Sequence, residues 1–159
     1  WRMEHIKRDL SNVKNKCVLC VDMNNSDDRK NLILFRGKFT FIIMNLYPYN
    51  NGHLMVCPYR HIASLSKLNE ETLSEIMKLI SKSSEILRKT LNAEGFNIGA
   101  NIGSVGGAGI DDHLHFHVVP RWKGDTNFMP VVGNTKVIMS GLHDTYDELF
   151  FHFQKGLAK

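Results

Sequence analysis

The first half of the chain carries short hydrophobic runs that are typical of β-strands. Residues 32–36 and 39–44 are two such runs, and the glycine between them predicts a hairpin or two adjacent antiparallel strands. Turn-forming residues 47–52 come next, after which residues 53–57 predict a third strand that a proline ends. A polar stretch at 22–30, before all three strands, is typical of a surface loop.

The hydrophobic period changes to that of a helix after Asn69, which stands where an N-cap residue is expected. Apolar residues then recur every three or four positions, at Leu73, Met77, Ile80, Leu87 and Leu91. This spacing predicts one long amphipathic helix from residue 70 to residue 91, with those side chains packed in the core or in a dimer.

Two further strands and a second helix complete the pattern. Residues 96–102 and 113–119 predict strands on either side of a glycine-rich stretch, and residues 144–153 predict an amphipathic helix. The inward-facing residues of that helix are Tyr146, Leu149, Phe150 and Phe153. The element order predicts an α+β fold, in which one long helix and a C-terminal helix pack on one face of an antiparallel sheet.

Length and composition fit one domain. The chain has 159 residues, of which 43% are hydrophobic, enough to bury a core of its own. We expect a single domain over residues 1–159, with an N-terminal segment at 1–30, a core at 31–122 and a C-terminal tail and helix at 123–159.

Charge and targeting features indicate which partners and which location to expect. The net charge is +4, but Lys and Arg are scattered along the chain, which argues against a nucleic-acid partner and still favours small polyanions. The sequence has no run of about 18 apolar residues, so we expect no membrane span. The opening residues lack the apolar region of a secretory signal. An odd number of cysteines, three, fits a reducing compartment, so we expect a cytoplasmic protein.

Three histidines alternate with apolar residues in the segment 113–119. Since alternate residues of a strand lie on one face, about 6.6 to 7 Å apart, the segment predicts His113, His115 and His117 on a common face. Leu114 and its alternating neighbours would anchor the other face in the core. Such a set can ligate a metal through an HxH pair, or it can carry out nucleophilic and acid–base chemistry.

A glycine-rich loop, residues 103–109, directly precedes these histidines. Successive backbone N–H groups of such a loop suit phosphate oxygens, which makes Ser104, Gly107 and Gly109 candidate phosphate contacts. A plain flexible connection is the alternative. The position of the loop beside three histidines favours the phosphate interpretation.

The segment HLHFHVV at 113–119 resembles the HφHφHφφ signature of the histidine triad superfamily, where φ is apolar. The similarity extends to NNGHLMVCPYRH at 50–61, FNIGANIGSVGGAGIDDHLHFHVVPRW at 96–122 and GDTNFMPV at 124–131. Together these segments resemble the bacterial subgroup related to diadenosine tetraphosphate phosphorylases and hydrolases.

The resemblance implies an α+β fold, a homodimer, and a nucleotide bound across the sheet. In this family the middle histidine attacks the α-phosphorus of the substrate, a role that falls on His115, while His117 contacts the phosphate and assists the leaving oxygen. Ribose and phosphate contacts fall on Asn45, His53 and Asn101. The implied activity is cleavage of dinucleoside polyphosphates, with water or phosphate as the acceptor. A nucleoside phosphoramidase and a non-catalytic, zinc-stapled nucleotide-binding module are the alternatives.

One departure from better-known branches concerns the leaving group. Those branches carry Ser or Gln three or four residues before the first triad histidine, where this chain has Ile110 and Gly109. Backbone N–H groups of the glycine loop or the Ser104 hydroxyl would have to replace that donor. Residues 121–123 either reach distal phosphates or form an exposed edge.

A CxxC motif, Cys17 and Cys20, has the spacing with which two thiolates hold one zinc ion. By resemblance to zinc-bearing members of the family, His61 and His113 complete the site, which would then be structural. The alternative is a pair of reduced thiols without metal. Cys57, inside a predicted strand, is expected to be a buried apolar residue.

Overall fold

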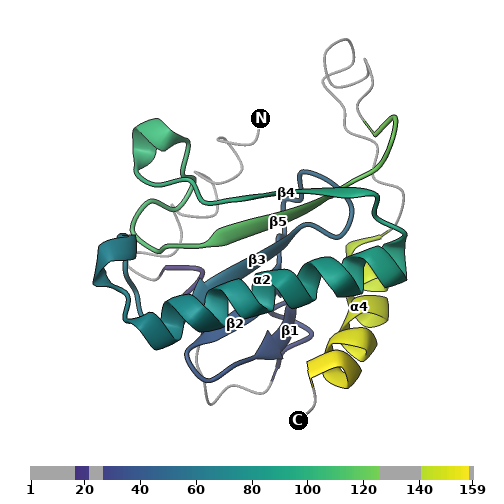
Figure 1. Ribbon diagram of the computed structural model, residues 1–159, viewed down its shortest axis with the longest axis horizontal. Helices are drawn as coiled ribbons and strands as arrows, with labels where there is room; N and C mark the ends of the chain where they lie inside the picture. Colours follow the sequence, from purple (N-terminus) through teal and green to yellow (C-terminus); the bar gives the residue numbers. More distant parts are fainter. Residues whose placement is uncertain (1–16, 22–26, 126–140, 158–159) are drawn as a thin grey trace.

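The computed structural model describes residues 17–21, 27–125 and 141–157, and it shows a five-stranded antiparallel sheet with two helices (Figure 1). The strands are β1 (Ile33–Arg36), β2 (Thr40–Met44), β3 (Leu54–Pro58), β4 (Gly95–Gly99) and β5 (Phe116–Arg121). The helices are α2 (Glu70–Leu91) and α4 (Leu142–Leu157), with short 3-10 turns η1 (Leu65–Lys67) and η2 (Ser104–Gly106). The predicted α+β class is confirmed.

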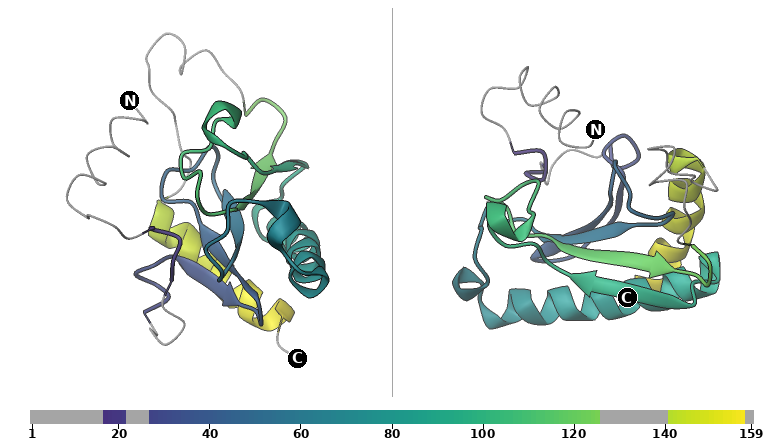
Figure 2. Two further views of the ribbon diagram at one scale, coloured as in Figure 1. Left: turned by 90° about the vertical axis from the view of Figure 1, so that its left-hand side faces the viewer. Right: turned by 90° about the horizontal axis from the view of Figure 1, so that it is seen from above.

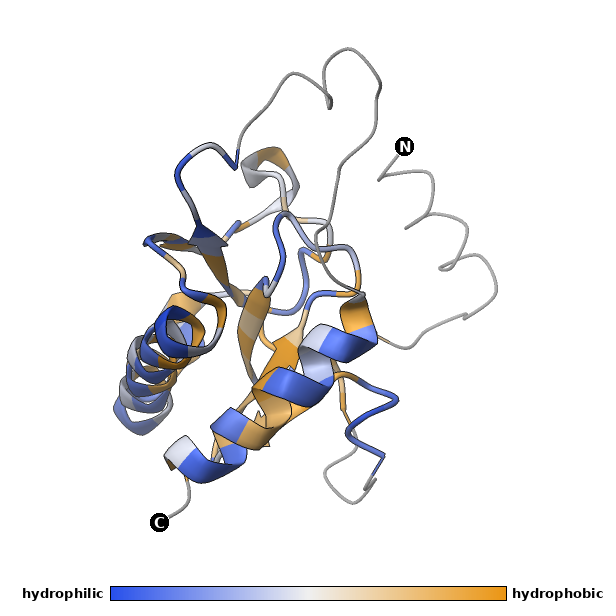
Figure 3. Ribbon diagram, turned by 90° about the vertical axis from the view of Figure 1, so that its right-hand side faces the viewer, coloured by the Kyte–Doolittle hydropathy of each residue, from blue (hydrophilic) through white to orange (hydrophobic). Residues whose placement is uncertain are grey.

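The strand order β1-β2-β3-β5-β4 puts β5 between β3 and β4. Helix α2 packs against β2, β3 and β5, while α4 packs against β1 and α2. Figure 3 shows the hydrophobic residues gathered on the strands between the two helices, with hydrophilic residues along the outer sides of both. Among the described residues, no helix combines the length and apolarity that crossing a bilayer requires.

Helix α2 begins where its cap predicts, because the Asn69 side chain accepts a hydrogen bond from the backbone N–H of Thr72. Its inward face is only partly the predicted one. Met77 is 60% exposed, whereas Ile76 is buried. Met77 is therefore outside the core, and its packing in a dimer stays a prediction. The buried stripe includes instead the polar residue Ser83, which an apolar count overlooks.

Helix α2 also holds the β1–β2 hairpin in place through Glu75. The Glu75 carboxylate accepts hydrogen bonds from the backbone N–H groups of Lys38 and Phe39 and from the Thr40 hydroxyl. A β-carbon at Gly37 would lie 2.9 Å from a Glu75 carboxylate oxygen, so glycine is required at this close approach. Glu75 therefore connects the helix to the hairpin.

The strand that carries the histidines differs from its prediction. It begins at Phe116 and continues through Pro120 to Arg121, whereas residues 113–119 were expected. His113 and His115 thus precede the strand, and only His117 lies within it. The residues just before the strand are held by a contact outside the sheet, since Leu114 donates its backbone N–H to the Ile62 carbonyl.

Two other elements differ in length from their predictions. Strand β4 ends at Gly99, so Asn101 lies in the loop that leads to η2 and not in a strand. Helix α4 is longer than residues 144–153, and it buries Tyr146, Leu149 and Phe153 as expected while Phe150 is half-buried. The division of the chain at residues 30 and 122 stays a prediction.

Candidate active site and metal centre

The ring of His115 is held by a backbone carbonyl. Its Nδ1 atom lies 2.8 Å from the carbonyl oxygen of His113, and the side chain is 5% exposed. Because a carbonyl oxygen only accepts hydrogen bonds, Nδ1 carries the proton of the neutral ring. The lone pair of His115 is therefore on Nε2, which is the form that a nucleophile needs.

The ring of His117 is oriented by a second histidine. The backbone N–H of Tyr49 donates to Nδ1 of His53 at 3.0 Å, so the neutral His53 ring carries its proton on Nε2. That atom lies 2.9 Å from Nδ1 of His117 and donates to it. Nε2 of His117 then carries the proton, so this atom can donate a hydrogen bond to an oxygen atom.

Asn45 supports the same arrangement. Its side-chain oxygen accepts from the backbone N–H of Tyr47, which directs the amide nitrogen toward Nδ1 of His53, 3.3 Å away. His53 is fully buried and Asn45 is 8% exposed. Both residues were predicted as ribose and phosphate contacts, and the structure places them behind the ring of His117.

The rings of His115 and His117 lie side by side. The ring centroids of His115 and His117 are 4.9 Å apart and the rings meet edge to face. The Tyr49 ring stacks on His53 with centroids 4.7 Å apart and lies 5.6 Å from His117. Tyr49 was not among the predicted site residues, because the turn sequence around it indicated a change of chain direction and no contact.

The glycine loop uses several of its own polar groups. Gly103 and Gly107 both have positive φ values, 75° and 83°, and flank the 3-10 turn η2. The N–H of Gly107 donates to the Ser104 carbonyl, and the Asn101 side chain donates to the Gly107 carbonyl. Ser104 and Gly109 are exposed. Phosphate binding by these residues stays a prediction.

Cys17, Cys20, His61 and His113 come together in the structure. Their ligand atoms all lie within 4.8 Å of one another. Nδ1 of His113 is 3.5 Å from Sγ of Cys17 and 3.6 Å from Sγ of Cys20, while Nδ1 of His61 is 3.2 Å from Sγ of Cys20. Tetrahedral coordination with bonds of about 2.0 to 2.3 Å puts neighbouring ligand atoms about 3.3 to 3.8 Å apart, so the four residues can hold a metal ion.

Hydrogen bonds behind the two histidines fit this use. Nε2 of His113 donates to the Pro58 carbonyl at 2.9 Å, which leaves Nδ1 unprotonated and facing the thiols. Nε2 of His61 lies 3.3 Å from a carboxylate oxygen of Asp112, the usual second partner of a metal-bound imidazole. Neither Pro58 nor Asp112 was predicted, because neither is itself a ligand.

Protonation states also suit a divalent cation. Burial lowers the pKa of His113, so this ring is neutral at pH 7. Burial raises the pKa of the Cys17 thiol to about 11, so a cation has to stabilise its thiolate. Cys57 is fully buried, which confirms its expected place in the core.

The cysteine segment and the glycine loop lie at the same end of the sheet. Residues 17–21 and η2 both lie at the end where β5 begins, as Figures 1 and 2 show. At the other end of β5, the guanidinium of Arg121 is paired with Asp125 and donates to Asn97. The Trp122 indole donates to the Leu91 carbonyl. These contacts support the edge interpretation of residues 121–123 over a contact with phosphates.

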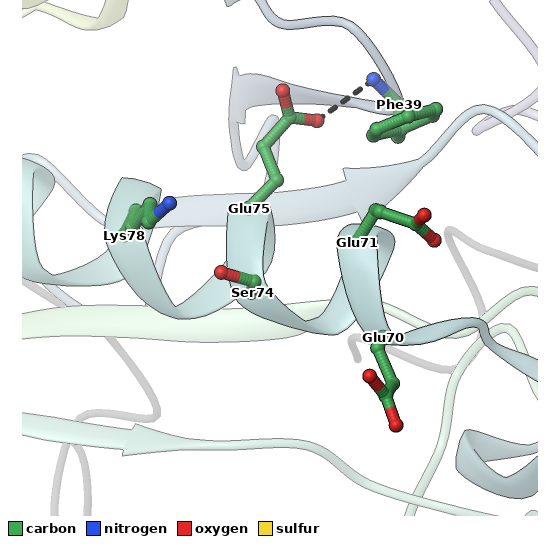
Figure 4. Close-up of a pocket in the computed structure, with 6 residues that line it drawn as sticks. All are labelled: Phe39, Glu70, Glu71, Ser74, Glu75 and Lys78. Atoms are coloured by element: carbon green, nitrogen blue, oxygen red, sulfur yellow. Dashed lines mark hydrogen bonds between the residues drawn. The ribbon is translucent and has the colours of Figure 1, made fainter.

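A surface depression on α2 is separate from these groups. It is lined by Phe39, Glu70, Glu71, Ser74, Glu75 and Lys78 (Figure 4). None of the predicted site residues lines it, and Glu75 is already occupied by the β1–β2 hairpin.

A five-stranded antiparallel sheet with buried His113 and His115 before its inner strand β5, and His117 within that strand, is the arrangement of the histidine triad class. The chain belongs to the HIT domain family, whose family model matches residues 26–124. Residues 126–131 of the chain, which are part of the segment GDTNFMPV, lie outside the described residues.

Characterised relatives and solved structures agree with this assignment. The chain is 39% identical to the AP-4-A phosphorylase of Mycobacterium tuberculosis over 140 residues, which cover 88% of this chain and 72% of the relative. It is 30% identical to the asymmetrical bis(5'-nucleosyl)-tetraphosphatase of Schizosaccharomyces pombe over 58% of this chain and 50% of that one. A zinc-bound histidine triad protein from Mycobacterium smegmatis shares the fold, with a TM-score of 0.64 and 22% identity over 78% of this chain and 84% of that one.

Proposed function

We propose that the protein is an enzyme that cleaves dinucleoside polyphosphates of the diadenosine tetraphosphate type through a nucleotidyl intermediate on His115. The observation that carries the proposal is the hydrogen bond from His115 Nδ1 to the His113 carbonyl, which leaves the Nε2 lone pair available. The substrate class is supported by the relatives named AP-4-A phosphorylase and bis(5'-nucleosyl)-tetraphosphatase.

The first half-reaction uses both rings. Nε2 of His115 attacks the α-phosphorus, so a P–N bond forms while the P–O bond to the leaving polyphosphate breaks. Nε2 of His117 donates a hydrogen bond to the leaving oxygen and stabilises the negative charge that develops there. The positive charge that develops on the His115 ring is stabilised by the charge-assisted hydrogen bond from Nδ1 to the His113 carbonyl.

In the second half-reaction an oxygen of the acceptor, water or inorganic phosphate, attacks phosphorus, a new P–O bond forms and the P–N bond breaks, which returns the His115 ring to its neutral form. When water is the acceptor, its surplus proton leaves to solvent. His53 keeps the correct tautomer of His117 in both steps, because its own proton stays on the nitrogen that faces His117.

Substrate contacts are assigned to the residues that solvent can reach. Asn101, Ser104 and the Gly107–Gly109 stretch are proposed to contact ribose and phosphate oxygens. Asn45 and His53 act in this scheme through the ring of His117, since both are buried.

We propose that zinc occupies the cluster of Cys17, Cys20, His61 and His113. Two thiolates and two imidazoles make a closed set of four ligands, the composition of a structural zinc site. Bound zinc would connect residues 17–21 to the sheet and supply no step of the reaction. A hydrolase using His113 and His115 as an HxH metal pair is disfavoured, because the His115 ring is not in the cluster.

Assembly and location extend the proposal. We propose a homodimer, supported by β4, which pairs with β5 alone among the described strands and leaves one edge open. Ile98 on that strand and Ile102 and Val105 after it are exposed hydrophobic residues. A cytoplasmic location stays a prediction.

Product analysis tests the function. The purified protein should convert diadenosine tetraphosphate to ATP and AMP with water as the acceptor, or to ATP and ADP with inorganic phosphate. Comparing reactions with and without phosphate identifies the acceptor. Faster release of AMP from an adenosine phosphoramidate than of either product from diadenosine tetraphosphate would favour the phosphoramidase, and no turnover of either compound would favour the binding module.

A further inference from the structure

We propose that His113 is a positioning residue that couples the metal cluster to the nucleophile, so that metal binding to its ring fixes the carbonyl that orients His115. The inference rests on the proposed function of His115. It assigns a catalytic consequence to a centre that is otherwise structural.

His113 takes part in both sites at once. Nδ1 of its ring faces the Cys17 and Cys20 thiols, while its backbone carbonyl accepts the hydrogen bond from His115 Nδ1. The residue is 1% exposed, so packing as well as these polar contacts restricts the movement of the ring. A shift of the His113 ring moves the acceptor of His115 with it.

The backbone here is not held by the sheet. Strand β5 begins at Phe116, whose partner on β3 is Val56, so residues 113–115 precede the ladder. The tether in the described backbone is the bond from Leu114 N–H to the Ile62 carbonyl, 2.7 Å long.

The metal ligands flank this tether on both sides. His113 directly precedes Leu114, and His61 directly precedes Ile62. A metal ion that joins the two rings would therefore close a small ring of contacts around the Leu114–Ile62 bond. Without the ion, the His113 ring keeps the hydrogen bond to the Pro58 carbonyl and only the longer contacts of Nδ1 with the two thiols.

The expected consequence is a loss of positioning with the fold retained. A displacement of a reacting group by about 1 Å can lower a rate about 100-fold. We therefore expect the metal-free protein to bind AMP within about threefold of the loaded protein and to form the nucleotidyl intermediate about 10- to 100-fold more slowly.

Amide hydrogen exchange provides a readout that does not depend on activity. Zinc-loaded wild type is compared with chelator-treated wild type and with the double variant Cys17→Ser/Cys20→Ser. The Leu114 amide should exchange at least about tenfold faster in both metal-free forms, while the amide of Val118, in the middle of β5, stays protected. Asp112→Asn should give a smaller change, and Asp111→Asn, its exposed neighbour, should give none.

Several results would overturn the coupling. One is an unchanged Leu114 exchange rate together with an unchanged first-turnover rate in the metal-free protein. Another is a parallel rise of Leu114 and Val118 exchange, which would show general loosening. If the loaded wild type forms no nucleotidyl intermediate, the proposed function fails, and the exchange comparison still decides whether the metal positions this backbone.

Discussion

His53 donates a hydrogen bond from Nε2 to Nδ1 of His117, 2.9 Å away, from a position without solvent exposure. The tautomer of His117 is therefore set by a fully buried residue. The backbone N–H of Tyr49 sets the tautomer of His53 in turn.

Replacement of His53 by Asn should lower kcat about 10- to 100-fold and leave KM within about threefold, since a hydrogen-bond donor aimed at developing charge contributes about 10²- to 10³-fold and only part of that contribution is lost. The reason is that His117 would be free to place its proton on Nδ1. Steady-state kinetics with diadenosine tetraphosphate measure both constants, with His152→Asn, an exposed histidine on α4, as the control. A rise in KM at constant kcat would instead indicate direct substrate binding by His53.

Metal removal should destabilise the protein. A ligand that binds only the folded state adds about 4 kcal/mol to the free energy of unfolding when present at about a thousand times its dissociation constant. Zinc should therefore raise the melting temperature of wild type and not of Cys17→Ser/Cys20→Ser. Elemental analysis should give one zinc per wild-type chain. If wild-type protein contains no zinc, and if its melting temperature is the same with and without added zinc, the site is contradicted.

Glu75→Gln should lower the free energy of unfolding by about 1 to 3 kcal/mol, because an amide cannot replace a carboxylate that accepts from three donors. Urea denaturation measures the change. Glu148→Gln, on the exposed surface of α4, serves as the control and should stay within about 0.5 kcal/mol of wild type. Equal stability of the two variants would show that Glu75 does not lock the hairpin.

Tyr146 should make the protein sensitive to alkali. Burial raises its pKa to about 12, and its hydroxyl donates to the Ile33 carbonyl. Because the folded-state pKa lies above the unfolded value near 10, this stabilisation is complete below about pH 10 and decreases as the pH rises toward 12. Tyr146→Phe should start about 1 kcal/mol less stable and lose less than wild type over that range. Parallel stability curves would contradict this role.

The strongest sequence patterns predicted the fold class and the groups that the site brings together. Alternating histidines and the CxxC motif are local signals, and Cys17 and His113 do meet although 96 residues separate them. The apolar count did not identify the buried face of α2 completely, because helix burial follows geometry and polar Ser83 occupies part of that face.

The supporting contacts could not be predicted in the same way. Pro58 and Tyr49 act through backbone groups that every residue type possesses, so their identity carries no signal. Asp112 acts through an exposed carboxylate that resembles the neighbouring Asp111 in sequence. The start of β5 was misplaced because alternation continues through His113 and His115 although the ladder does not.

The central claim is that His115 becomes covalently nucleotidylated. Protein quenched with acid-free denaturant during turnover of diadenosine tetraphosphate, digested and analysed by mass spectrometry, should carry one adenylyl group on His115. His115→Asn should carry none and lose at least about 10⁴-fold in kcat. An adenylyl group on another residue, or near wild-type turnover by His115→Asn, would contradict the account.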